Sequence, residues 1–239
     1  MSSAIEGRIV WVTGSGRGIG AATALLLASR GARVVLSART SGEIQEVADR
    51  IRRSGGQALP MRCDVTLQAE IHNLLKLVKS TWGAVEILIN NAGIAVFKKI
   101  VHTSEDEWDA MMSANVKSAF LCTQAVLPDM IEVQSGHIVN IISVAGKQPY
   151  ESSGAYCASK YGLAGFTDVL RLEMRKFHIR VTAVYPGAVN TGLWDSVKAD
   201  RSKMMHVQDI AKIIVEACDH PPAVGLEEVV IRPASGDIN

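Results

Sequence analysis

The sequence predicts an α/β fold, a doubly wound, mostly parallel seven-stranded sheet with helices on both faces. Short runs of β-branched residues alternate with longer helical stretches along the 239 residues, and a glycine-rich turn follows the first run. Such alternation implies parallel strands joined by right-handed crossovers. Because 48% of the residues are hydrophobic and 21% are charged, one large core is expected. We therefore expect residues 1–239 to form a single domain.

Four strands are predicted in the first half of the chain. They are the short apolar runs 8–12, 33–37, 57–62 and 85–90, which are typical of strands buried on both faces of a sheet. Helices are expected at 18–30, at about 42–54 and at about 66–82. Gly31 is expected to end the first helix, and Ser41 is expected to cap the second.

The second half of the chain continues the same pattern. Ser104 and Glu107 form a capping box, which opens a helical region that reaches about residue 134, with Pro128 near its end. Strands are expected at 137–142, 180–185 and 227–232, and helices at about 155–177 and at 207–217. These three strands complete the predicted sheet.

Charge and composition argue against several classes of protein. The formal net charge is +1, with Lys and Arg spread along the chain, so nucleic acid is not an expected partner. No apolar run approaches the roughly 20 residues of a membrane span, and the polar residues Glu6 to Arg8 stand where a signal peptide is apolar. A cytoplasmic protein is expected. The cysteines and histidines lack metal-ligand spacing, so no metal site is predicted and the cysteines are expected to be buried free thiols.

The first predicted strand ends in a glycine-rich turn, Thr13-Gly14-Ser15-Gly16-Arg17-Gly18-Ile19-Gly20. Missing Cβ atoms allow a diphosphate to approach the backbone and the N-terminus of the next helix. The glycines do not follow the usual Gly-x-Gly-x-x-Gly spacing counted from Gly14, so a purely structural turn is the alternative. The position of the turn between a strand and a helix favours a dinucleotide site.

The end of the second predicted strand indicates which dinucleotide is bound. An Asp or Glu at this point usually contacts a free ribose 2′-hydroxyl. Here the sequence is Ser37-Ala38-Arg39-Thr40, and no acid occurs before Glu43. Arg39, together with Arg17 in the glycine turn, can pair with a 2′-phosphate. The sequence therefore favours NADP(H) over NAD(H).

Tyr156 and Lys160 are the expected chemical centre. They lie four residues apart in a predicted helix, which places their side chains on one face. An ammonium about 4 Å from the phenol, at an effective dielectric of about 20, would lower its pKa by roughly three units. Tyr156 would then exchange a proton near neutral pH. An ordinary Tyr and Lys one turn apart is the alternative, and for this pair alone it is the better one.

Six elements between Thr13 and Thr191 resemble, in order and spacing, those of the short-chain dehydrogenase/reductases. They are Thr13-Gly14-x-x-x-Gly18-x-Gly20, Asn90-Asn91-Ala92-Gly93, Asn115, Ser143, Tyr156-x-x-x-Lys160 and Pro186-Gly187-x-x-x-Thr191. The chain is most similar to the NADP-dependent branch that includes 3-oxoacyl-acyl-carrier-protein reductases and carbonyl reductases. The segment after Thr191 contributes less to this resemblance.

The resemblance implies catalytic roles for four residues. Ser143 is expected to hydrogen-bond the substrate oxygen, and Tyr156 to donate its proton as hydride arrives from the nicotinamide. Lys160 is expected to hold the nicotinamide ribose and to lower the Tyr156 pKa. Asn115, expected within a helix, would support a water that links Lys160 to solvent.

The resemblance also implies a set of cofactor-binding residues. Asp64 is expected to contact the adenine, Pro186 and Gly187 to shape the nicotinamide side, and Thr191 to bind the carboxamide. The expected set is Gly14, Ser15, Gly16, Arg17, Gly18, Ile19, Gly20, Arg39, Asp64, Val65, Asn91, Gly93, Tyr156, Lys160, Pro186, Gly187, Val189 and Thr191.

Residues 192–206 occupy the position of the family's substrate lid. Leu193, Trp194, Met204 and Met205 suggest an adaptable apolar cover and a partly hydrophobic substrate. Packing of these side chains against the body or a neighbouring subunit is an equally good interpretation. Tyr150 and Phe97 are further candidates for the substrate pocket.

These features predict an NADPH-dependent oxidoreductase that reduces a ketone or aldehyde, as a small-molecule substrate, to an alcohol. The same residues serve the reverse oxidation of a secondary alcohol, so the direction stays open. A third hypothesis is a catalytically silent NADP(H)-binding sensor or scaffold, against which the presence of both Tyr156 and Lys160 argues. The apolar helices near 109–134 and 155–177 resemble those through which family members associate, so a homodimer or homotetramer is expected.

Overall fold

A computed structural model describes residues 3–195 and 197–236 of the chain and confirms the predicted fold class. Seven strands form one parallel sheet in the order β3-β2-β1-β4-β5-β6-β7. The strands are β1 (Ile9–Thr13), β2 (Arg33–Ala38), β3 (Gln57–Arg62), β4 (Ile87–Asn90), β5 (Gly136–Ile141), β6 (Ile179–Pro186) and β7 (Glu228–Ile231). All seven predicted strands are present, with ends displaced by at most two residues.

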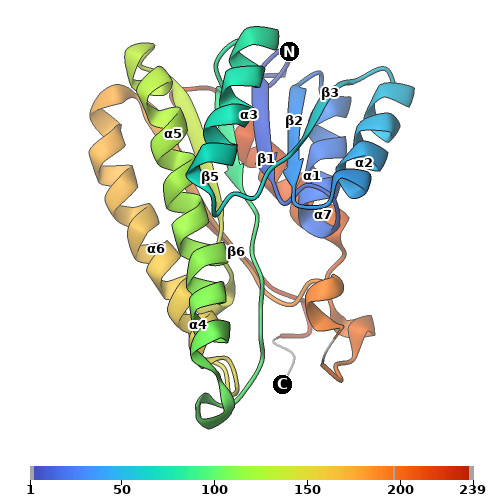
Figure 1. The fold of residues 1–239 in the computed structure, drawn as a ribbon, viewed down its shortest axis with the longest axis vertical. Helices are drawn as coiled ribbons and strands as arrows, with labels where there is room; N and C mark the ends of the chain where they lie inside the picture. Colours follow the sequence, from blue (N-terminus) through green and yellow to red (C-terminus); the bar gives the residue numbers. More distant parts are fainter. Residues whose placement is uncertain (1–2, 196, 237–239) are drawn as a thin grey trace.

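Helices cover both faces of this sheet (Figure 1). They are α1 (Gly18–Ser29), α2 (Ser41–Arg53), α3 (Gln68–Thr81), α4 (Glu105–Met112), α5 (Ser118–Glu132), α6 (Gly154–Met174) and α7 (Val207–Cys218). Side chains of α1, α2 and α7 share one core with one side of the sheet, and side chains of α3, α5 and α6 share another. Val10 and Trp11 enter opposite cores, because successive side chains of a strand point to opposite faces.

The structure corrects two predictions about helices. Ser41 is the first residue of α2 rather than its cap, and the preceding Thr40 makes no capping side-chain bond. The helical region opened by Ser104 and Glu107, whose capping box is confirmed, is not one regular helix. A π-helical segment (Ser113–Lys117) separates α4 from α5, so the chain gains an extra residue in this turn.

The strand order creates a crevice at the centre of the sheet. β1 lies between β2 and β4, and the chain therefore reverses its direction of winding at β1. Ligands of open α/β sheets bind outside the carboxyl ends of the strands at such a point. All four cysteines are buried and free, as predicted. None of the described helices is both long and apolar enough to cross a bilayer.

Candidate functional site

A cleft of about 1100 Å³ opens at the carboxyl ends of the strands. The segments that follow β1 through β6 all contribute lining residues, from Gly14 after β1 to Gly187 after β6. Single drug-sized ligands occupy pockets of roughly 300–1,000 Å³. The cleft is therefore large enough for an extended dinucleotide and a small second molecule.

Ser143 lies in the cleft immediately after β5, where it begins a short 3-10 helix. Its Oγ accepts a hydrogen bond from the backbone N–H of Ala145 at 3.1 Å. This contact fixes the hydroxyl oxygen at the end of the strand. Since a serine hydroxyl can donate one hydrogen bond while accepting others, Ser143 can still donate to an oxygen in the cleft.

Tyr156 and Lys160 enter the same cleft from the first turns of α6. Both side chains are buried, and Lys160 Nζ lies 5.8 Å from the centre of the Tyr156 ring. The ammonium donates a hydrogen bond to the carbonyl of Ile141 at 3.1 Å, at the end of β5. The structure thus brings three of the four predicted catalytic residues to one wall of the cleft.

Together, the side chains around Tyr156 do not lower the pKa of its phenol, as was expected of Lys160. Burial raises the pKa of Tyr156 to about 12, although a hydrogen bond with Ser143 opposes this effect. Burial also lowers the pKa of Lys160 to about 8. The Lys160 ammonium, which was expected to lower the pKa of the phenol, donates its hydrogen bond to the Ile141 carbonyl. At neutral pH the phenol is therefore protonated, the form that a proton donor requires.

Asn115 lies behind the cleft, at the centre of the π-helical segment rather than in a regular helix. Its Oδ1 accepts from the backbone N–H of Ile94 at 2.8 Å, and its Nδ2 donates to the Ile94 carbonyl at 2.9 Å and to Ser159 Oγ at 2.9 Å. Asn115 therefore joins the loop after β4 to α6. π-Bulges occur frequently at functional sites, and this one aims an amide between the two elements.

The glycine-rich turn fits a phosphate group. Gly14 has φ +62°, and a Cβ there would stand 2.9 Å from the Cα of Ala92. The first turn of α1 contains no acidic residue, and Arg17 at its N-cap makes no capping side-chain bond. Unsatisfied N–H groups at the N-terminus of a helix favour an anion.

Charged groups lie at the part of the cleft that is formed by the segments after β1, β2 and β3. Arg17, Arg39 and Asp64 all line it. Burial raises the pKa of Asp64, but hydrogen bonds from Thr66 and the charges of Arg39 and Arg62 lower it more, so the net direction is downward. Asp64 Oδ1 accepts from the Thr66 N–H at 3.0 Å and from its hydroxyl at 2.7 Å. The carboxylate is thus held ionised and fixed in orientation.

Comparisons with known proteins agree with this geometry. A family model described as short chain dehydrogenase matches residues 8–202. The chain belongs to this family. An uncharacterized oxidoreductase of Staphylococcus aureus (strain N315) is 37% identical over 226 residues, with 95% of this chain and 97% of the relative covered. A sepiapterin reductase of Chlorobaculum tepidum is 36% identical over 239 residues, with 96% and 98% covered.

Solved short-chain dehydrogenases have the same fold. A metagenomic short-chain oxidoreductase in complex with NADP superposes with a TM-score of 0.86 at 35% identity, covering 97% of this chain and 99% of that one. A short-chain type dehydrogenase/reductase from Mycobacterium marinum gives a TM-score of 0.89 at 28% identity, covering 96% and 95%. Each similarity spans nearly the whole length of this short-chain dehydrogenase.

Most, though not all, of the predicted cofactor residues line the cleft. Sixteen of the eighteen do so: Gly14, Gly16, Arg17, Gly18, Ile19, Arg39, Asp64, Val65, Asn91, Gly93, Tyr156, Lys160, Pro186, Gly187, Val189 and Thr191. Ser15 lies beneath the turn, where its N–H and hydroxyl bond to Ser37. Gly20 packs against the Gly14 carbonyl. These two residues support the turn of this short-chain dehydrogenase instead of facing the cleft.

Glu43 is a charged lining residue that the sequence did not indicate. The Glu43 side chain covers Gly16, with Cβ and Oε2 each 2.8 Å from the position that a Gly16 Cβ would take. The sequence showed only that Glu43 is the first acid after β2. Its placement depends on where α2 begins, and the structure starts this helix at Ser41, so Glu43 lies in the first turn.

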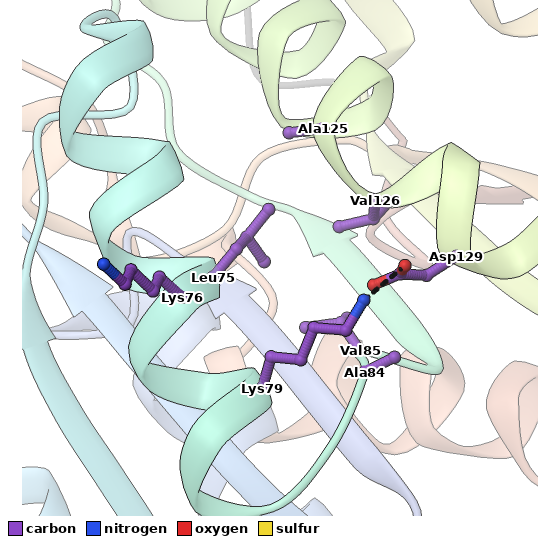
Figure 2. Close-up of a pocket in the computed structure, with 8 residues that line it drawn as sticks. All are labelled: Leu75, Lys76, Lys79, Ala84, Val85, Ala125, Val126 and Asp129. Atoms are coloured by element: carbon purple, nitrogen blue, oxygen red, sulfur yellow. Dashed lines mark hydrogen bonds and ion pairs between the residues drawn. The ribbon is translucent and has the colours of Figure 1, made fainter.

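A second, smaller hollow of about 270 Å³ lies between α3 and α5 (Figure 2). Its lining residues are Leu75, Lys76, Lys79, Ala84, Val85, Ala125, Val126 and Asp129. The Lys79 ammonium pairs with the Asp129 carboxylate at 2.8 Å across its mouth. Since that acid is paired and the other lining is mostly aliphatic, we assign the chemistry of the short-chain dehydrogenase to the large cleft.

Gly93→Ala is expected to lower turnover by roughly tenfold or more. A Cβ at position 93 would lie 2.9 Å from Asn115 Oδ1 and 3.8 Å from Lys160 Nζ, and misplacement of catalytic groups by about 1 Å costs up to about 100-fold. Steady-state kinetics would measure the effect. Gly225→Ala is the matched control, because no heavy atom lies within 4 Å of that position. Equal rates for both variants would contradict the prediction.

Burial of Lys160 predicts a stability that increases with pH. Its folded pKa is about 8, below the ordinary 10.5, so the unfolded chain binds more protons between these values. The free energy of unfolding should therefore rise as pH increases through this window, by up to about 3 kcal/mol. Urea unfolding of the wild type and of Lys160→Met near pH 7 and pH 9.5 tests this. The prediction would be refuted if the difference in free energy of unfolding between the wild type and Lys160→Met were the same at both pH values.

Proposed function

We propose that this short-chain dehydrogenase is an NADPH-dependent reductase that converts a ketone or aldehyde into an alcohol. The observation that carries the proposal is the grouping of Ser143, Tyr156 and Lys160 on one wall of a cleft that begins at a glycine-rich turn. Tyr156 is protonated there, since burial raises its pKa to about 12. A buried, neutral phenol is suited to donate a proton to a reduced carbonyl oxygen.

NADP(H) is the cofactor that the lining residues support. The glycine turn and the free N-terminus of α1 suit a diphosphate, and Arg17 and Arg39 line the part of the cleft where a 2′-phosphate would lie. A relative of 35% identity was solved in complex with NADP. We assign Asp64 and Val65 to the adenine side, and Gly187 and Thr191 to the nicotinamide side.

The chain's residues share the work of polarising and protonating the substrate. Bound NADPH supplies the hydride that the carbonyl carbon accepts. Ser143 donates a hydrogen bond to the carbonyl oxygen, and Tyr156 donates its phenolic proton to that oxygen as negative charge develops there. The Lys160 ammonium stabilises the phenolate that remains. Asn115 acts through Lys160, because it holds the Ile94 backbone and Ser159 against α6.

Residues 192–206 form the lid in this proposal. Thr191 opens the segment, and its Oγ1 accepts a hydrogen bond from the Leu193 N–H at 3.4 Å. Leu193 and Trp194 line the cleft, while Met204 is buried against the body. The lining position of Leu193 and Trp194 supports an apolar cover, and the burial of Met204 supports packing against the body. Ser196 lies outside the described residues.

The experiment is NADPH consumption against a panel of ketones, aldehydes, diketones, β-ketoesters, quinones and sugars, followed by absorbance. Sepiapterin belongs in the panel because a relative of 36% identity is named a sepiapterin reductase. Alcohols with NADP⁺ test the reverse direction, which uses the same residues. NADPH binding without turnover of any compound in either direction would leave the silent sensor as the better description.

We also propose a homo-oligomer formed through α5 and α6. Phe120 of α5 is 43% exposed, and Val169 and Leu172 of α6 are 55% and 65% exposed, so the two helices together present an apolar surface typical of an association site. The helices lie side by side at one edge of the molecule (Figure 1). Sedimentation that shows only a 25.7 kDa species at micromolar concentration would reject this proposal.

A further inference from the structure

Three aromatic rings form a continuous wall that begins at Tyr156. The Phe97 ring contacts Tyr156 edge-on, with centroids 5.7 Å apart and planes at 64°. The Trp194 ring stacks on the other side of Phe97, with centroids 5.3 Å apart and planes at 20°. All three residues line the cleft. Since Phe97 follows β4 and Trp194 belongs to the segment after β6, two distant parts of the chain complete this wall.

A fourth ring is held in place near the same wall. Tyr150 lines the cleft, and its hydroxyl accepts a hydrogen bond from Gln148 Nε2 at 2.7 Å. Gln148 Oε1 in turn accepts from Arg232 at 2.9 Å. Because arginine only donates hydrogen bonds, it sets the orientation of the Gln148 amide. The Tyr150 ring is therefore positioned by a chain of contacts that reaches the segment after β7.

Few cationic side chains line the cleft. Arg17, Arg39 and Lys160 are the cationic side chains that line the described part of the cleft. Arg39 follows β2, and Arg17 extends from the glycine turn to within 3.8 Å of the position that a Gly192 Cβ would take, while the Lys160 ammonium lies 5.8 Å from the centre of the Tyr156 ring. The acid beside Tyr150 is Glu151, whose side chain is 87% exposed. The arginine that reaches the Tyr150 side, Arg232, donates to the Gln148 amide at 2.9 Å and does not line the cleft, and burying the charge of an anionic substrate against the aromatic rings would be costly.

We propose that the substrate is a neutral, flat, aromatic carbonyl compound whose ring packs on the wall formed by Phe97, Trp194 and Tyr150. This inference rests on the proposed function and names the substrate class for the same cleft. Aromatic rings attract one another through edge-to-face and offset contacts beyond simple burial. With its ring against the wall, such a substrate would present its carbonyl oxygen to Ser143 and Tyr156. Carboxylated and phosphorylated substrates are disfavoured.

Two diketones and one keto acid test the proposal. One diketone is the reference, and each of the other two compounds changes one part of it. Methyl phenyl diketone is the reference, phenylglyoxylate replaces its methyl ketone by a carboxylate, and cyclohexyl methyl diketone replaces its flat ring by a puckered one. We expect kcat/KM with NADPH to fall roughly tenfold or more for the carboxylate, and roughly threefold to tenfold for the cyclohexyl compound. Equal or better reduction of phenylglyoxylate, or of the cyclohexyl compound, would overturn the proposal.

Variants link these preferences to the wall. Phe97→Leu and Trp194→Leu keep the surface apolar but remove a ring, so the phenyl-to-cyclohexyl preference should fall towards one. Leu193→Lys adds a cation to the lining and should raise the phenylglyoxylate-to-diketone ratio by roughly threefold or more. Trp108→Leu is the control, because Trp108 of α4 does not line the cleft. Unchanged ratios in the first three variants would contradict the proposal.

Direct binding separates this inference from the proposed function. Methyl phenyl diketone should quench tryptophan fluorescence of the NADP⁺ complex, and the quenching should be lost in Trp194→Leu but retained in Trp108→Leu. Reduction of carbonyls without preference among the three compounds would refute the substrate class alone. Failure to reduce any carbonyl would refute the reductase proposal itself.

A separate observation concerns the cofactor end of the cleft. Glu43 stands at the third position of α2, with its Oε2 at 2.8 Å from the position of a Gly16 Cβ. The first N–H groups of α2 receive no capping side chain from Thr40. A carboxylate at this position is favoured by the helix dipole, and it shares the cleft with Arg17 and Arg39.

We infer that Glu43 is a specificity-determining residue that weakens binding of the 2′-phosphate relative to the 2′-hydroxyl. The carboxylate lies against Gly16 of the glycine turn and would repel a dianionic phosphate bound near Arg39. Glu43→Gln keeps the size of the side chain and removes its charge. We expect this variant to bind NADPH roughly threefold to tenfold more tightly, with NADH affinity unchanged.

Titration of nucleotide fluorescence measures both affinities without any turnover. Glu46→Gln is the matched control, since Glu46 lies one turn along α2, is exposed and does not line the cleft. The same tightening in Glu46→Gln would indicate a general charge effect and would overturn the inference. An unchanged NADPH affinity in Glu43→Gln, or an equal gain for NADH, would also overturn it.

Discussion

Tyr156→Phe is expected to lower kcat for carbonyl reduction by roughly 100-fold to 10,000-fold while NADPH affinity stays within about twofold. Removal of a positioned general acid typically costs this range in rate. The ring itself keeps its edge contact with Phe97 at 5.7 Å, because only the hydroxyl is deleted. Steady-state kinetics and fluorescence titration of the same preparation measure the two quantities.

The control for this variant is Tyr161→Phe. Tyr161 lies on the same helix, α6, but it is 44% exposed and does not line the cleft. It should retain wild-type turnover. Turnover of Tyr156→Phe close to that of Tyr161→Phe, across several ketones, would remove Tyr156 from the proton transfer. Loss of both turnover and NADPH binding would point to a structural role instead.

The sheet was predictable because each strand carries its own signal. A run such as Ile9–Thr13 is buried along its whole length, and a parallel strand covered on both faces must be continuously apolar. The glycine-rich turn after this strand was also predictable, because its glycines can be read directly from the sequence. The helical break at Ser113–Lys117 was not predictable, because its cause lies in the tertiary contacts of Asn115 with Ile94 and Ser159.

The pKa values of the site could not be predicted from the sequence, because they depend on burial and on distances between side chains. The spacing of Tyr156 and Lys160 predicts that they share a helix face, but it says nothing about the Ile141 carbonyl, which binds the ammonium at 3.1 Å. Burial raises the pKa of Tyr156, so the predicted direction of that pKa was wrong, while the predicted proximity of the two side chains was right. Phe97 and Trp194 were expected near the substrate pocket, but their mutual stacking depends on how two loops fold.

Arg39→Asp is expected to weaken NADPH binding by roughly 100-fold and to leave NADH affinity nearly unchanged. Arg39 lines the cleft after β2, and its charge already acts on Asp64. A charge-assisted hydrogen bond contributes about 1.5–3 kcal/mol, and the new carboxylate adds repulsion of a 2′-phosphate. The ratio of the two dissociation constants, measured by fluorescence titration, reports the change.

Two further variants make this result interpretable. Arg39→Gln removes the cation without adding an anion. Its NADPH affinity should therefore lie between that of the wild type and that of Arg39→Asp, because no second carboxylate is placed beside Asp64. Arg50→Asp makes the same charge reversal on an exposed position of α2 that does not line the cleft, so it should bind both nucleotides normally. If Arg39→Asp kept the wild-type preference, the 2′-phosphate would have to be bound by Arg17 without Arg39, and the repulsion between Glu43 and the phosphate would then oppose the attraction of the phosphate to Arg17.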